Sequence, residues 1–80
     1  MTDTELFQHI EKLVQEEHEL MQHAEGTGLN DDQHARMKQL EVSLNQCWDL
    51  LRQRRARRHA GLSPDGAQVR DPEIVEHYQQ

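Results

Sequence analysis

The chain has 80 residues, of which 34% are hydrophobic and 30% are charged, and its net charge is −6. This length predicts one small domain with a thin core. No apolar run approaches the roughly 20 residues that a membrane-spanning helix needs, so no membrane partner is expected. The acidic N-terminus lacks the apolar region of a secretory signal, and the expected location is therefore the cytoplasm.

The negative charge is unevenly distributed along the chain. Residues 1–51 carry eleven acidic and three basic side chains, a net charge of −8. Residues 52–58 carry five arginines and no acid, and residues 59–80 carry four acids and one arginine. One short basic segment in an otherwise acidic chain argues against a general nucleic-acid coat protein.

The first helix is predicted over about residues 4–25. Thr2 and Glu5 have the spacing of an N-terminal capping box. Glu17 lies within the apolar stripe and is expected at its edge, with an ion pair to Arg36 or Lys38 as the alternative. The stripe repeats at helical spacing and is widened by three further residues, so that it comprises Leu6, Ile10, Leu13, Leu20 and Ala24 together with Phe7, Val14 and Met21.

The second helix is predicted over about residues 31–60, after a turn in which Gly26 ends the first helix. Asn30 and Gln33 have the spacing of a second capping box. The apolar seam of this helix consists of Met37, Leu40, Leu44, Cys47 and Leu51. The short connection predicts an antiparallel hairpin. In that register residue i faces roughly residue 55 − i, and residues 52–59 would extend about 12 Å beyond the first helix.

The last part of the chain, residues 63–80, is predicted as a turn followed by a short helix. Ser63-Pro64-Asp65-Gly66 has turn composition. Pro72 after Asp71 opens a helix over about residues 72–78, which is too short to be stable unless it docks. The expected division is therefore a hairpin over residues 1–62 and a C-terminal piece over residues 63–80.

The arginine segment is the leading candidate for a binding site. At about 100° per residue its five arginines are expected to point around the whole helix, which leaves no face to bury. They would then bind phosphate or an acidic protein, since arginine binds oxyanions with two hydrogen bonds. In the alternative interpretation they form a solvated helix end that Asp3, Glu5, Glu73 and Glu76 neutralise. The candidate residues are Arg52, Arg54, Arg55, Arg57 and Arg58.

Trp48 beside the seam has two interpretations. It either lies at a core edge that the C-terminal helix covers with Ile74 and Tyr78, or anchors an interface with a partner. The apolar stripes are wider than one hairpin covers, which predicts a homodimer with a four-helix arrangement. The interface candidates are Trp48, Phe7, Val14 and Met21.

No pattern of residues indicates catalysis, a metal site or a cofactor. The six histidines offer at most pairs of ligands at helical spacing, whereas a zinc site needs three or four. Cys47 lies on the apolar seam, where a thiol behaves as a small hydrophobe. We therefore expect a protein that is not an enzyme and that binds neither metal nor cofactor.

The segment from Gln46 to Arg58, which reads QCWDLLRQRRARR, resembles a family of short actinobacterial proteins known only as a domain of unknown function. The resemblance extends to Glu16-Glu17-His18, the glycine-rich turn, Gly61-Leu62 and Gln68-Val69-Arg70. It implies a small helical module in a bacterial cell and supplies no activity, cofactor or catalytic residue.

Together these patterns predict an all-α protein, an antiparallel coiled-coil-like hairpin with a short C-terminal helix. The predicted function is that of a small non-enzymatic protein-interaction or regulatory module, which acts through the apolar seam and the arginine-rich helix end. The alternative is a nucleic-acid or ribosome-associated binding protein that uses Arg52–Arg58.

Overall fold

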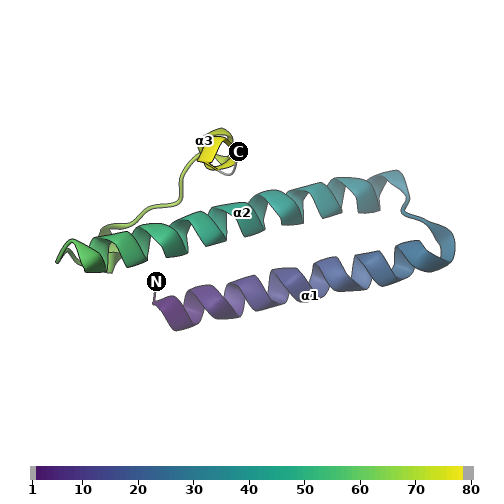
Figure 1. Ribbon diagram of the computed structural model, residues 1–80. Coiled ribbons are helices and arrows are strands. Elements are labelled where there is room, and N and C mark those ends of the chain that lie inside the picture. The colour runs from purple at the N-terminus through teal and green to yellow at the C-terminus, as the bar shows by residue number, and fades with distance from the viewer. Residues whose placement is uncertain (1, 79–80) are drawn as a thin grey trace.

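The computed structural model describes residues 2–78, with side chains described as far as Val75. It contains α1 (Asp3–Thr27), α2 (Asp31–His59), the short 3-10 helix η1 (Pro64–Gly66) and α3 (Pro72–Tyr78). Over this described range no strand occurs, and the predicted all-α class is confirmed. Figure 1 shows α1 and α2 as an antiparallel pair, with α3 beside α2 and away from α1.

Both long helices begin with the capping boxes that the sequence predicts. The Thr2 hydroxyl accepts a hydrogen bond from the Glu5 N–H at 3.1 Å, and the Thr2 N–H donates to the Glu5 carboxylate at 3.2 Å. Asn30 and Gln33 make the same reciprocal pair at 2.8 and 3.0 Å. These bonds satisfy N–H groups that the first turn of a helix leaves without partners.

A glycine with positive φ follows the C-terminal end of each long helix. Gly26 was expected to end α1, and this prediction is wrong: the helix continues through Gly26 to Thr27, and Gly28 adopts the left-handed conformation with φ of 74°. Gly61 follows α2 with φ of 76°, as predicted. The Leu62 N–H then donates to the Arg57 carbonyl at 2.8 Å, and this bond closes the end of α2 and directs the chain back along it.

The core lies between the first part of α1 and the second half of α2. Its buried cluster contains Leu6, Ile10, Leu44, Cys47, Leu50 and Leu51, with Leu13 and Ala67 packed against it. Leu6 therefore lies among the α2 residues that the predicted register placed opposite it. α3 packs on α2, and its Val75 is fully buried.

The half of the hairpin nearest the turn is packed more loosely. No residue from Glu11 to Gln39 is buried. An ion pair joins the helices here: Nε and Nη2 of Arg36 donate to the two carboxylate oxygens of Glu16, the Nη2 bond at 2.8 Å. Glu17 is partly buried, and the arginine pairs with its neighbour Glu16 instead. This ion pair lowers the pKa of Glu16 through the hydrogen bond from Arg36.

Candidate functional site

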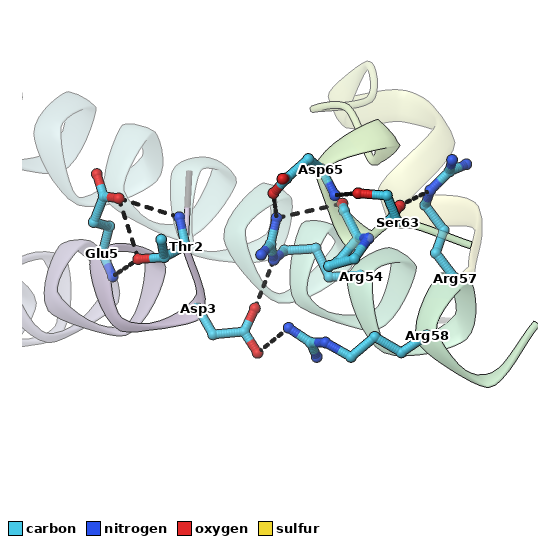
Figure 2. A network of polar contacts seen from close by, with 9 residues as sticks. Thr2, Asp3, Glu5, Arg54, Arg57, Arg58, Ser63 and Asp65 are labelled. Atoms are coloured by element: carbon cyan, nitrogen blue, oxygen red, sulfur yellow. Dashed lines mark hydrogen bonds and ion pairs between the residues drawn. The ribbon is translucent and has the colours of Figure 1, made fainter. Parts of the chain in front are cut away.

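The arginine segment does not project into solvent as a uniformly charged helix end. Arg54 is only 5% exposed. Its Nε donates to Asp3 of α1 at 2.6 Å, and its Nη1 donates to the Pro64 carbonyl and the Asp65 carboxylate, both at 3.3 Å. The expectation that this segment has no face to bury is therefore wrong at Arg54. The reason is that Asp3, the first residue of α1, binds it from one side, while η1 folds back onto its other side (Figure 2).

Asp3 binds a second arginine of the segment. Its other carboxylate oxygen pairs with Arg58, so one acid at the start of α1 joins two successive turns of α2 (Figure 2). The hydrogen bonds from Arg54 and then Arg58 lower the pKa of Asp3. The predicted free overhang of residues 52–59 is accordingly wrong, because the first turn of α1 is fastened to it. Glu5, a predicted partner of the arginines, accepts instead from Thr2.

The remaining arginines differ in how far they are engaged. Arg57 donates through Nε to the Ser63 carbonyl at 2.6 Å. Arg52 is half exposed and lies 3.5 Å from a carboxylate oxygen of Asp49. Arg55 is exposed and makes no ion pair or hydrogen bond with the described residues.

The acidic tail meets the arginine segment at a residue that the sequence did not indicate. The acid that pairs is Asp65, whereas Glu73 makes no ion pair within the described part of the chain. The side chain of Glu76, the other predicted tail partner, lies outside the described residues.

Four large apolar side chains are exposed on the hairpin: Phe7 (49%), Val14 (44%), Met21 (55%) and Trp48 (41%). Phe7 directly follows the buried Leu6, and Trp48 directly follows the buried Cys47. In an antiparallel pair of helices, the residue that follows a core position points to the same side of the pair in both helices. Val14 and Met21 repeat the position of Phe7 at heptad spacing. We call this side the open face.

The C-terminal segment reaches part of the opposite face of the hairpin. A cavity of about 170 Å³ on that side is lined by His9 of α1, Ser43 and Leu50 of α2, and Val69 of the C-terminal segment, among others. His9 and Ser43 each precede a core position, which places the cavity away from the open face. The C-terminal segment therefore covers one side of the hairpin and leaves Phe7 and Trp48 on the other.

The C-terminal helix does not cover Trp48 in the predicted manner. Ile74 is itself 47% exposed, and among the described side chains of α3 the buried one is Val75. The side chain of Tyr78, the second predicted partner, lies outside the described residues.

A buried acid on α2 was missed by sequence reasoning. Asp49 is fully buried, and Arg70 binds both of its carboxylate oxygens, one of them at 2.8 Å. This hydrogen bonding lowers the pKa of Asp49. Asp49 lies about 200° around the helix from Cys47 and thus points away from α1, so the helical periodicity predicts exposure at this position. A buried acid there requires a third segment to cover it.

Groups that could carry metal or thiol chemistry were also located. Within the described residues, no three histidine, cysteine, aspartate or glutamate side chains gather as a metal site. Cys47 is buried, and burial raises the pKa of its thiol. A protonated, buried thiol is a poor nucleophile. Over the same range, none of the helices is both apolar enough and long enough to cross a membrane.

Comparisons with known proteins place the chain in a family. Residues 2–80 match the model of the family described as "Protein of unknown function (DUF2630)". The chain is 42% identical over 78 residues to uncharacterized proteins of Mycobacterium bovis and Mycobacterium tuberculosis, covering 96% of this chain and 90% of each relative. No solved structure matches it significantly. The predicted resemblance is thereby confirmed, and the chain belongs to the DUF2630 family.

Proposed function

We propose that this protein is a small non-enzymatic interaction module, and that the open face is the surface through which it binds. The observation that carries the proposal is the exposure of Phe7, Val14, Met21 and Trp48 on one side of the hairpin. Large apolar and aromatic side chains gathered on one surface are typical of protein interfaces.

A second copy of the chain is the proposed partner. A thin core and an uncovered apolar stripe favour burial of that stripe against another hairpin, as in a four-helix bundle. The heptad positions of the stripe suit this packing, because Phe7, Val14 and Met21 would form one continuous ridge on α1. Two-fold symmetry would bring the same surface of each copy into contact.

Analytical ultracentrifugation at micromolar concentration tests this proposal. We expect the wild-type chain to sediment at about twice its monomer mass of 9.4 kDa. Val14→Lys should give a folded monomer, because it places a charge within the contact. Gln15→Lys is the matched control, since Gln15 is exposed one residue further round α1, and this variant should remain dimeric. A monomeric wild-type chain, or equal dissociation of both variants, would contradict the proposal.

Nucleic-acid binding through Arg52–Arg58 is the alternative function, and fewer groups support it. Arg54, Arg57 and Arg58 are engaged within the chain, which leaves Arg55 and the half-exposed Arg52 as the most available charges. Binding to duplex DNA through two phosphates would weaken with salt at a log–log slope of about −1.8. A salt titration of the wild type and Arg55→Gln with labelled duplex separates this function from the first.

A further inference from the structure

The connection between α2 and α3 lies along α2 and is attached mainly by polar contacts. We call residues 63–71 the strap. Past η1 the strap has no regular secondary structure, and Ala67 has an extended conformation with φ of −69° and ψ of 142°. Figure 1 shows it running back along α2 from the end of that helix towards α3.

Arg54 holds the strap at Pro64 and Asp65. Four further side chains that hold the strap form one stripe of α2. They are Gln46, Asp49, Gln53 and Arg57, at spacings of three, four and four residues, which places them on one side of the helix. This stripe, which we call the outer ridge, faces away from α1. It is therefore a surface of α2 that the hairpin itself does not use.

Most contacts of the outer ridge are with the main chain of the strap. Gln53 Nε2 donates to the Gln68 carbonyl at 2.7 Å, and the Gln68 N–H donates back to Gln53 Oε1 at 3.3 Å. Gln46 Nε2 donates to the Arg70 carbonyl at 3.1 Å, and Arg57 Nε donates to the Ser63 carbonyl. Contacts of this kind hold an extended segment whatever its side chains are, as in other modes of peptide recognition.

One contact of the outer ridge depends on the identity of a strap side chain. The guanidinium of Arg70 binds both oxygens of Asp49, which is fully buried and also accepts from Gln53 Nε2 at 2.9 Å. A carboxylate bound in this way by a planar guanidinium is selective for arginine over lysine. Asp49 therefore fixes the position of the strap along α2.

Apolar packing contributes less to this attachment. Val69 is 63% exposed, and Leu62 and Ile74 on either side of the strap are 54% and 47% exposed. Ala67 packs against the core, and Val75 beyond the strap is buried. Gly61, with its left-handed conformation, lies in the connection before the strap, where a change in backbone angles would redirect the whole segment.

We propose that the outer ridge is a docking track for an extended, arginine-bearing segment. Its own strap fills the track within one chain, and the same segment of a second copy fills it when the chain's own strap is released. Exchange of one identical element between copies is an established route to association. The track is separate from the open face, so this inference does not depend on the proposed function.

A peptide of residues 62–71, titrated into the isotope-labelled full-length chain and followed by NMR, tests the track. The wild-type chain should bind weakly, because its own strap competes at high effective concentration. Arg70→Ala releases that strap and should bind the peptide at least tenfold more tightly, with shifts at the side-chain amides of Gln46 and Gln53. Arg55→Ala, which changes an exposed arginine outside the track, should behave as wild type.

Two further measurements complete the test. The peptide with Arg70→Ala should lose this binding, and the peptide with Arg70→Lys should not restore it. Gln53→Ala in the Arg70→Ala chain should also weaken binding of the wild-type peptide, because it removes both bonds to the Gln68 main chain and one bond to Asp49. The inference would be overturned if the peptide bound equally to the wild-type and Arg70→Ala chains. It would also be overturned if peptides with and without the arginine bound equally to the Arg70→Ala chain. Circular dichroism of each variant shows that its helices are retained.

Discussion

The two ends of the hairpin are built on different principles. At the strap end, formed by residues 2–10 and 40–75, lie all of the buried side chains that the structure describes and the contacts of Asp3, Arg54 and Asp49. At the turn end, residues 11–39, no side chain is buried and one ion pair, Glu16 with Arg36, joins the helices. The strap end is therefore held by packing and polar contacts between three segments. The turn end depends on helix formation and capping, and it is the region where local opening is expected first.

The largest expected difference between the ends concerns leucines in the apolar stripe. Leu44→Ala removes a buried side chain at the strap end, and we expect a loss of about 2–5 kcal/mol in the free energy of unfolding. Leu20→Ala at the turn end should lose clearly less, because Leu20 is only partly buried. Chemical denaturation of both variants measures the difference. Equal losses would show that the turn end is as well packed as the strap end.

Two adjacent arginines of α2, Arg54 and Arg55, should also differ in their effects. Arg54→Gln removes the guanidinium that joins Asp3, Asp65 and the Pro64 carbonyl, so the start of α1 and η1 should both become less protected. Arg55→Gln changes an exposed residue of the same charge and should leave amide exchange unchanged. Hydrogen exchange resolved by residue makes this comparison. Equal protection in both variants would mean that the buried arginine does not join these segments.

Acid should weaken the strap end through its lowered pKa values. The hydrogen bonds from Arg54 to Asp3 and from Arg70 to Asp49 lower both pKa values below the ordinary 3.8. Each pair therefore stabilises the fold above pH 3.8, and its contribution disappears as the pH falls through the lowered pKa. Thermal melts over this range should show a steep fall in Tm for the wild type.

Single substitutions divide this pH dependence between the two ends. Asp49→Asn should flatten the acid response at the strap end, whereas Glu16→Gln should remove only the smaller response of the exposed pair at the turn end. An unchanged pH profile in Asp49→Asn would show that the Arg70 contact does not stabilise the folded chain.

The smallest effects are expected from the histidines of the turn end. His18 and His23 are exposed, and their contacts are with Gln22 and Thr27 on the same helix. Replacing either by Ala should change the free energy of unfolding by less than about 0.5 kcal/mol. Added zinc should leave the Tm of the wild type unchanged. A rise in Tm with zinc that both substitutions abolish would instead indicate a metal site.

The sequence predicts the hairpin well because its signals are local. The capping boxes at Thr2 and Asn30, the short turn and the seam that includes Leu44 and Cys47 all depend on spacings within one helix. The burial of Arg54 and Asp49 could not be predicted from such local spacings. It depends on where Asp65 and Arg70 return in space, and periodicity within α2 carries no information about that return.

The open face could be predicted from the sequence only in part. The wide stripe with Phe7 and Val14 correctly predicted apolar residues that one hairpin leaves exposed. Which side of α2 the C-terminal segment would cover did not follow from the stripe, because Trp48 and Asp49 are neighbours in sequence and point in different directions. The structure separates them: Asp49 is buried and Trp48 is exposed.

The pairing of Gln53 with the main chain of Gln68 constrains the number of residues in the strap more than their identity. Because the Gln53 amide meets the strap only at backbone groups of Gln68, the exposed side chains of Gln68 and Val69 can be replaced without loss of these bonds. A deletion or insertion between Pro64 and Arg70 would instead displace the guanidinium from Asp49 by about 3.3 Å per residue. The number of residues between Pro64 and Arg70 should therefore change little among relatives.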